Sequence, residues 1–258
     1  MSAGGDAGKP DWRGIALPAA TLLLAEVAAR VVGITSESLA APSDMALAFG
    51  EALGDGSLLR ATWETVAAAV AGLLAGGLLG LGIGIWFGLS RTARRLALWP
   101  VELLRPLPSV AMIPIAMMIF GFGYRMEILV VAFTCFWPML LLTESAVRHV
   151  EPCLYEVAHM LGLTTPARVF KIVLPAALPR IFVAFRLAAG ISLVVAVTVE
   201  VAANPAGLGY ALMLAQQSLH PDLMFALLLW VGFVGWASNC LLLAIQRRLF
   251  SHVAGAQA

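Results

Sequence analysis

Six long apolar runs dominate this sequence and limit the folds open to it. They cover residues 15–34, 66–89, 98–120, 128–147, 181–201 and 223–245. A helix needs about 20 apolar residues to cross the hydrocarbon core of a bilayer, and each run reaches roughly that length. Only 12% of the residues are charged, which is about half the share in soluble domains. The sequence therefore predicts an all-α polytopic membrane protein with six transmembrane helices.

The basic residues predict how these helices are oriented. With the N-terminus in the cytoplasm, eleven lysines and arginines fall in cytoplasmic segments, and only Arg60 and Arg125 fall in external loops. Such an excess is typical of the cytoplasmic loops of membrane proteins. We expect residues 1–14 and 251–258 to be cytoplasmic tails and residues 15–250 to form one six-helix domain. The net charge of only +1 gives the chain no general affinity for nucleic acid.

The first apolar run has two interpretations. Lys9 and Arg13 precede it, and residues 39–41 read Leu-Ala-Ala, which would suit a cleaved signal peptide. Its length of about 20 residues is enough to cross a membrane, which favours a retained helix. Glu26 and Arg30 interrupt this run four residues apart. That spacing places both side chains on one helix face, where they can pair.

The second run carries a regular glycine pattern. Gly72, Gly76, Gly80, Gly84 and Gly88 recur at every fourth position. A stripe of glycine along one side of a membrane helix lets the backbone of another helix come close. That helix could belong to a second copy of the chain or to the same bundle, and we favour packing within the bundle.

Three prolines interrupt the third run: Pro106, Pro108 and Pro114. Prolines free backbone carbonyl groups, which a membrane helix tolerates only where protein or water satisfies them. Broken helices of this type commonly line transport sites, although a kinked packing helix would show the same pattern. If the third and fifth runs line a translocation pathway, its candidate wall residues are Met117, Met118, Ser192 and Thr198.

Residues 151–179 form the longest amphipathic, charge-bearing interruption between apolar runs. Because apolar runs flank it, this stretch must lie in water at a membrane face, and the charge bias places that face in the cytoplasm. Its composition predicts a short helix from Pro152 to about Leu161, a turn at Gly162, and a second short helix.

The second short helix has its own boundary signals. A hydroxyl of Thr164 or Thr165 could cap its start, and Pro166 suits its first turn, where no backbone N–H is needed. Pro175 and Pro179 should then break the helix before the next span begins.

This cytoplasmic stretch resembles the EAA motif of ABC importer permeases. In that motif Glu-Ala-Ala is followed after three residues by Gly, and nine residues later by Ile-x-Leu-Pro. The matching residues are Glu156-Val157-Ala158, Gly162 and Ile172-Val173-Leu174-Pro175, with Val157 the one departure. The resemblance implies a coupling helix between the fourth and fifth spans that docks in a groove of a separate ATPase subunit. The coupling residues that it implies are Tyr155, Glu156, Val157, Ala158, Gly162, Thr165 and Pro166.

Three further strings look like the nitrate/sulfonate/taurine branch of these permeases. They are Leu103-Leu104-Arg105-Pro106-Leu107-Pro108, Phe120-Gly121-Phe122-Gly123 and Gly207-Leu208-Gly209-Tyr210. The Ala-Ala-Asn-Pro at residues 202–205 departs from relatives that often have more glycine there. The resemblance implies a homodimer in the bacterial inner membrane, with two ATP-binding cassette subunits and an external solute-binding protein. It also implies import, by alternating access, of a small solute such as a sulfonate, nitrate or taurine-like anion.

The sequence contains no ATP-binding loop. Its only lysines, Lys9 and Lys171, lie outside any Gly-x4-Gly-Lys-Ser/Thr sequence, so ATP and magnesium are expected on the partner ATPase. The three cysteines and four histidines are too scattered for a disulfide framework or a metal site. We therefore expect no catalytic residue and no cofactor in this chain.

Two other classes of protein were weighed against the importer. A self-sufficient secondary transporter or channel would usually carry a coupling acid near mid-membrane, whereas Glu102, Glu144 and Glu200 lie toward the ends of the runs. An intramembrane enzyme would need a Ser/His or paired-Asp site at membrane depth, and the sequence offers none.

Overall fold

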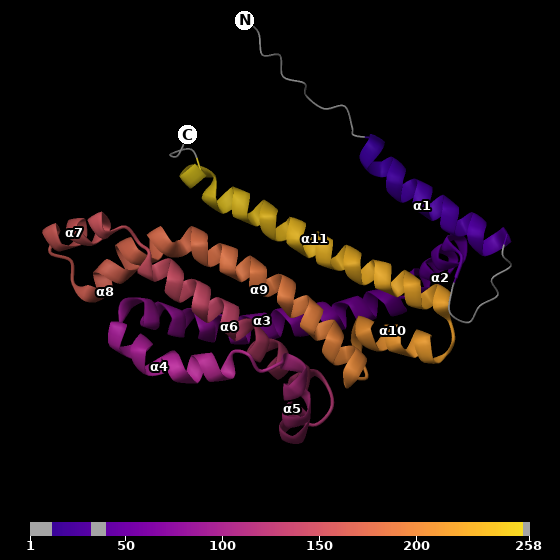
Figure 1. Ribbon diagram of the computed structural model, residues 1–258, viewed down its shortest axis with the longest axis horizontal. Coiled ribbons are helices and arrows are strands. Elements are labelled where there is room, and N and C mark those ends of the chain that lie inside the picture. Colours follow the sequence, from indigo (N-terminus) through magenta and orange to yellow (C-terminus); the bar gives the residue numbers. More distant parts are fainter. Residues whose placement is uncertain (1–11, 32–39, 255–258) are drawn as a thin grey trace, which may run out of the picture.

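The computed structural model describes residues 12–31 and 40–254, and every regular element within them is helical (Figure 1). The elements in order are α1 (Trp12–Val31), α2 (Pro42–Gly54), α3 (Ser57–Leu89), α4 (Arg91–Leu104), the 3-10 turn η1 (Ser109–Met112), α5 (Ile113–Phe120), α6 (Tyr124–Arg148), α7 (Pro152–Met160), α8 (Thr165–Arg168), the π-helical turn η2 (Val169–Val173), α9 (Leu174–Ala202), α10 (Gly207–Gln217) and α11 (Pro221–Ala254). The predicted all-α class is confirmed for this part of the chain.

Four helical stretches in the described ranges are long and apolar enough to cross a membrane. They are α3, α6, the continuous stretch from Thr165 to Ala202, and α11 as far as Leu249. A fifth span results if α4 and the η1–α5 segment, which bend by 89° at their break, count as one. The sequence predicted six spans, and the described residues contain four or five helical stretches that could be spans. The C-terminal end of the first predicted span falls at residues 32–34, which, like residues 1–11 and 255–258, lie outside the described part.

The glycine stripe of α3 lies against α6 of the same chain. A Cβ atom added at Gly80 would lie 2.6 Å from the carbonyl oxygen of Phe136, and one at Gly84 would lie 2.7 Å from that of Leu140. Real Cβ atoms do not approach backbone oxygen that closely, so these positions exclude any side chain. Within the described chain, the stripe serves packing inside the bundle, as the sequence analysis favoured.

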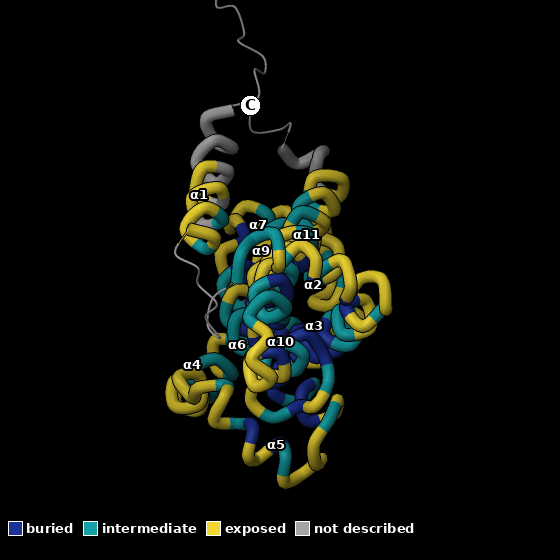
Figure 2. Tube along the Cα trace, turned by 90° about the vertical axis from the view of Figure 1, so that its right-hand side faces the viewer, coloured by how far each residue is buried: buried dark blue, intermediate teal, exposed yellow. Residues whose placement is uncertain are grey.

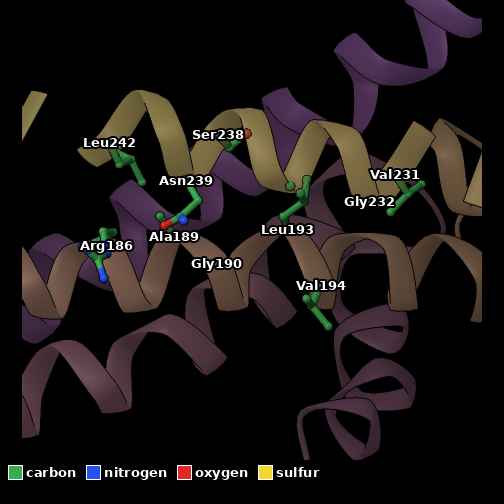
Figure 3. A pocket seen from close by; sticks show the side chains of 11 residues that line it. Arg186, Ala189, Gly190, Leu193, Val194, Val231, Gly232, Ser238, Asn239 and Leu242 are labelled. Carbon is green, nitrogen blue, oxygen red and sulfur yellow. The ribbon is translucent and has the colours of Figure 1, made fainter. Parts of the chain in front are cut away.

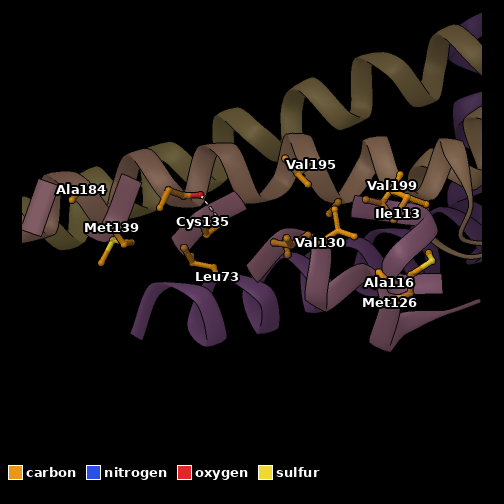
Figure 4. Close-up of a cluster of buried hydrophobic side chains, with 14 residues drawn as sticks. Leu73, Ile113, Ala116, Met126, Val130, Cys135, Met139, Ala184, Val195 and Val199 are labelled. Carbon is orange, nitrogen blue, oxygen red and sulfur yellow. Dashed lines mark hydrogen bonds between the residues drawn. The ribbon is translucent and has the colours of Figure 1, made fainter. Parts of the chain in front are cut away.

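The apolar core forms where α3, α6 and α9 meet. Small residues of α9, such as Ala184 and Ala188, belong to one buried cluster with Val130, Val131 and Met139 of α6. Figure 4 shows part of this cluster, including Ala184, Val130 and Met139. Because lipid tails are as apolar as these side chains, close van der Waals packing holds such helices together. Figure 2 shows the buried residues gathered along these helices, while α4 and α5 stay largely exposed.

The Glu26–Arg30 pair predicted for the first run is formed. Arg30 Nε donates to Glu26 Oε1 at 2.6 Å, and the backbone N–H of Ser43 donates to the other carboxylate oxygen at 3.1 Å. This carboxylate therefore also joins α1 to the start of α2. The ion pair has a structural role, as expected for charges inside an apolar helix.

The third run is broken at one place. α4 ends at Leu104, and Pro106 and Pro108 lie in the four-residue connection before η1. Pro114 does not break the run, contrary to the expectation, because it occupies the first turn of α5. The first turn of a helix has no N–H partner to lose, so proline fits there.

Different helices lie at the two ends of the long axis of the molecule. Figure 1 shows α7 and α8 at one end of the bundle, and α2 and α10 at the other. The charge bias predicts that the α7–α8 end is cytoplasmic and that the α10 end is external.

Candidate coupling and translocation sites

The turn between α7 and α8 has the geometry expected from Gly162. Its φ of +61° is left-handed, a conformation that glycine adopts without a steric penalty. The N–H of Leu163 donates to Ala158 O at 3.1 Å, and the N–H of Gly162 donates to His159 O at 3.0 Å. These bonds satisfy carbonyl groups that the end of α7 would otherwise leave unpaired.

The predicted coupling residues divide into an exposed and a buried set. Glu156, Val157, Gly162, Thr165 and Pro166 are exposed. Tyr155 is half-buried, and burial raises the pKa of its phenol. Ala158 is fully buried, so its role in this conformation is to hold α7 against the bundle.

The exposed surface of this segment is apolar. Met160 is 85% exposed, Leu161 67% and Phe170 70%. Met160, Leu161 and Phe170 have no regular spacing in the sequence that would predict this exposure. Exposed apolar residues on a segment that is predicted to lie in water are candidates for contact with another protein. We call Val157, Met160, Leu161 and Phe170 the apolar coupling patch.

A second apolar cluster anchors this segment to the long helices. Val147 and Val150 at the end of α6 pack with Val173 of η2 and Ile181 of α9, and Leu154 and Tyr155 lie against them. This contact joins α7 directly to α6 and α9.

Two local expectations for this segment are wrong. Thr164 precedes α8 but makes no capping hydrogen bond with its side chain, and Thr165 lies inside the helix. Pro175 and Pro179 do not break the helix, which runs on from Thr165 to Ala202. The π-helical turn η2 is the physical reason, because Leu174 N–H bonds to Val169 O five residues back. This wider turn changes the hydrogen-bond register immediately before Pro175, which has no N–H to donate.

The four predicted pathway residues have different environments. Met118 is almost fully exposed on α5, whereas Met117 packs against the core. Ser192 is buried, and its hydroxyl donates to Ala189 O within the same helix. Thr198 is exposed and donates to Val194 O. The structure therefore does not show these side chains meeting around one space in the single chain.

A polar cluster at the opposite end joins two helices, α3 and α9, to the start of α10. The first three N–H groups of α10 each have a side-chain acceptor. Gly207 N donates to Glu64 Oε2 at 3.1 Å, Leu208 N to Thr65 Oγ1 at 2.8 Å, and Gly209 N to Glu200 Oε2 at 2.8 Å. Carboxylates and hydroxyls are favoured at helix N-termini because these N–H groups have no partner within the helix.

Glycine is required where α10 meets this cluster. Gly207 has a φ of +87°, and a Cβ there would overlap the carboxylate of Glu200. The sequence analysis treated the Gly-Leu-Gly string only as a family resemblance. Glu200 was noted only as an acid near the end of its run, and its position seven residues before Gly207 could have indicated this contact.

A further buried acid lies next to this cluster. Glu127 lies in the first turn of α6 and is buried. Asn204 Nδ2 donates to Glu127 Oε2 at 2.6 Å. Asn204 therefore satisfies one oxygen of the buried carboxylate, while Oε1 has no partner among the described residues. A buried polar atom without a partner is costly. The burial results from tertiary packing, which a single charged residue near a glycine-rich turn does not reveal.

Two further charged residues, Glu144 of α6 and Arg186 of α9, have defined partners elsewhere in the bundle. Glu144 of α6 lies 3.7 Å from Arg94 and 3.5 Å from Arg148, near the α7 end. Arg186 lies beside a cavity of about 300 Å³ between α9 and α11 (Figure 3). Its Nη1 donates to Gln246 Oε1 at 3.3 Å.

Among the residues described, no cluster of His, Cys, Asp or Glu side chains has the arrangement of a metal site.

Long apolar helices with polar connections at both ends define a polytopic membrane protein. Residues 72–255 match the family described as the binding-protein-dependent transport system inner membrane component, and the chain belongs to that family. It is therefore an ABC importer permease in the inner membrane. It is not itself an enzyme and binds no cofactor, because a separate ATPase subunit hydrolyses ATP.

Two relatives and one solved structure illustrate this similarity. The chain is 30% identical over 237 residues to a putative aliphatic sulfonates transport permease protein, SsuC, of Bacillus subtilis strain 168, covering 92% of this chain and 86% of that protein. It is 30% identical over 191 residues to the taurine transport system permease protein TauC of Escherichia coli K12, covering 72% and 70%. A crystal structure of an amino acid ABC transporter with histidines matches with a TM-score of 0.65 at 18% identity, over 78% of this chain and 98% of that chain. This last likeness shows the fold.

Proposed function

We propose that this chain is the permease of an importer for a small organic sulfonate or a similar anion. Two copies would form the membrane channel, with two ATPase subunits in the cytoplasm and a solute-binding protein outside. Residues 15–250 would form the six-span domain, and the tails at 1–14 and 251–258 would be cytoplasmic. The solute would cross by alternating access, driven by closure of the ATPase subunits on ATP.

The apolar coupling patch carries the coupling part of this proposal. Met160, Leu161 and Phe170 expose apolar surface at the end of the molecule that carries most of the basic residues. Exposed apolar residues in water favour burial against a partner. Glu156 is exposed beside them and can supply a polar contact at the rim of the same interface.

The anchoring cluster explains how movement of an ATPase would reach the membrane helices. Tyr155 and Leu154 pack on the ends of α6 and α9, and Arg180 Nη1 donates to His149 O at 3.2 Å. Close-packed interiors transmit displacement rather than absorb it. A shift of α7 would therefore move α6 and α9, and a rotation of these two helices would open one side of the pathway and close the other.

Similarity to relatives supports the solute class. SsuC and TauC are described as transport permeases for aliphatic sulfonates and for taurine, and both solutes carry a sulfonate group. At about 30% identity, this chain shares most of its length with both proteins.

Uptake by living cells tests the proposed function. A host strain from which the gene has been deleted is compared with the same strain carrying the restored gene. Radiolabelled ethanesulfonate, taurine, nitrate and bicarbonate are offered separately. We expect the restored gene to increase uptake of at least one sulfonate, and an affinity-tagged permease to co-purify an ATPase. Equal uptake of every anion by the two strains would contradict the solute assignment, and the absence of a co-purifying ATPase would contradict the coupling assignment.

A further inference from the structure

The break in the third predicted span borders a cavity of about 310 Å³. Arg105 and Ser109 contribute to its wall from the two sides of the break. Thr134 and Trp137 contribute from α6, and Ile191 from α9. Because α4 and η1 meet at a sharp bend, the chain leaves space here that a straight helix would fill.

This cavity lies near the middle of the long helices. Thr134 and Trp137 come ten and thirteen residues after the start of α6, which has 25 residues. At 1.5 Å per residue, they lie about 15–20 Å from that end. Ile191 is likewise near the middle of α9, which runs from Leu174 to Ala202. The cavity therefore lies at the depth where the hydrocarbon core would be most apolar.

The cavity wall is rich in hydrogen-bond donors and carries no carboxylate. Within the described residues, no Asp or Glu lies within ion-pair distance of Arg105. The indole N–H of Trp137 is buried and has no partner in the described chain. Arginine keeps its charge at any physiological pH, and a charge at membrane depth is costly unless an opposite charge or water compensates it.

We propose that this cavity holds the oxyanion headgroup of the transported solute during its passage, with Arg105 as the principal ligand. This inference rests on the proposed function and assigns a binding site to it. A guanidinium presents several N–H groups in one plane, which match two oxygens of a sulfonate at once. Ser109 supplies an additional donor. The indole N–H of Trp137 is buried and unpaired, so it donates to the solute only after a small shift of the side chain. Phe133 and Ile191 give the wall an apolar side that suits a short alkyl chain.

The size of the site agrees with a small solute. Pockets that enclose drug-sized ligands occupy about 300–1,000 Å³, so this cavity lies at the lower end of that range. A short alkyl sulfonate fits such a space. A lipid headgroup has the same anionic chemistry, and the experiment must therefore distinguish the two sources.

Three substitutions test the site in host cells. Arg105→Gln removes the charge, Arg105→Lys keeps the charge but loses the planar donors, and Trp137→Phe removes only the indole N–H. Arg186→Gln is the matched control, because Arg186 lies beside a cavity of similar size between α9 and α11. Co-purification of the ATPase shows for each variant that folding and coupling are intact.

We expect Arg105→Gln to lower uptake of ethanesulfonate about ten- to a hundredfold, the loss typical of a hydrogen bond to a charged group. Arg105→Lys should retain part of the uptake, and Trp137→Phe should lower it about fivefold. Arg186→Gln should stay near the wild-type rate. Wild-type uptake by Arg105→Gln, or an equal loss in Arg186→Gln, would overturn the site.

Binding of radiolabelled ethanesulfonate to the purified permease in nanodiscs separates solute from lipid. We expect equal binding in neutral and in anionic lipid, and loss of binding by Arg105→Gln in both. Binding that disappears only in anionic lipid would assign the cavity to a lipid headgroup and overturn the proposal. If the wild-type protein imports a different anion, the same variants are measured with that anion. If it imports none of the anions offered, the proposed solute class and this site fail together, while ATPase co-purification still tests the coupling role.

Discussion

Thr65 and Glu200 lie 135 residues apart in the sequence, yet Thr65 Oγ1 and Glu200 Oε2 are 3.0 Å apart. Thr65 Oγ1 also accepts a hydrogen bond from the N–H of Leu208 at 2.8 Å. Both side chains are buried. One hydroxyl group thus joins α3, α9 and the start of α10, and it does so where water cannot replace a lost bond.

Removal of this hydroxyl should loosen α10. Thr65→Val keeps the shape of the side chain but leaves the Leu208 N–H and one bonding position of Glu200 unpaired, which costs about 1–3 kcal/mol. We expect a lower midpoint of thermal unfolding and faster proteolysis at α10 in the purified permease. Thr65→Ser retains the hydroxyl and is the control. Equal stability of the Val and Ser variants would show that the bond contributes nothing.

The glycine stripe gives a second prediction. Gly76→Ala places a methyl group against the backbone of Ala132, whereas Gly82→Ala, in the same helix, meets nothing within 4 Å. Backbone cannot move aside as a flexible side chain can, so we expect Gly76→Ala to reduce the yield of folded permease sharply. Gly82→Ala should fold normally. Fluorescence size-exclusion chromatography of the two variants measures this, and matching profiles would contradict the packing role of the stripe.

The turn after α7 can be tested through its backbone alone. No atom lies within 4 Å of a Cβ added at Gly162, so the left-handed φ is the only obstacle to a side chain there. We expect Gly162→Val to strain the turn by about 1–3 kcal/mol and to abolish uptake, while the permease still inserts. Gly162→Asn should be tolerated, because asparagine adopts this conformation more readily. Normal uptake by Gly162→Val would show that this loop only connects two helices and does not couple the ATPase to transport.

The apolar coupling patch predicts loss of ATPase binding on charge insertion. Leu161→Asp places a carboxylate in the proposed interface, where its burial against the partner would be unfavourable. We expect the ATPase to be lost from pull-downs, and uptake with it. Cys153→Asp, at an exposed position in the first turn of α7, is the control. Glu156→Ala should have a milder effect, because it removes one polar contact at the rim. Retention of the ATPase by Leu161→Asp would place the docking surface elsewhere.

Cysteine labelling tests the predicted orientation. In a background without the three native cysteines, Asp55→Cys and Asp222→Cys should react with an impermeant reagent added to whole cells. Arg94→Cys and Arg168→Cys should react only after the membrane is opened. Labelling of Arg168→Cys from outside would reverse the topology and remove the coupling loop from the cytoplasm.

Much of this architecture is determined by the sequence alone, because the constraints are local. Apolar runs of membrane length become helices since an unpaired backbone group is too costly in lipid. Gly162 predicts a turn because glycine adopts a left-handed φ without steric penalty. Pro166 predicts the first turn of α8 because its ring fixes φ at a helical value. The four-residue period of the glycine stripe likewise follows from the helix repeat, before any partner is known.

Tertiary structure decided which of these elements meet. The partner of the stripe is α6 of the same chain, and the helix continues through Pro175 because a π-turn precedes it. The buried carboxylate of Glu127 accepts a hydrogen bond from Asn204, 77 residues later in the sequence. Arg105 shares a cavity with Trp137 only because the chain bends at the break beside α6. Such contacts depend on the packing of distant segments, and no local pattern of residues carries that information.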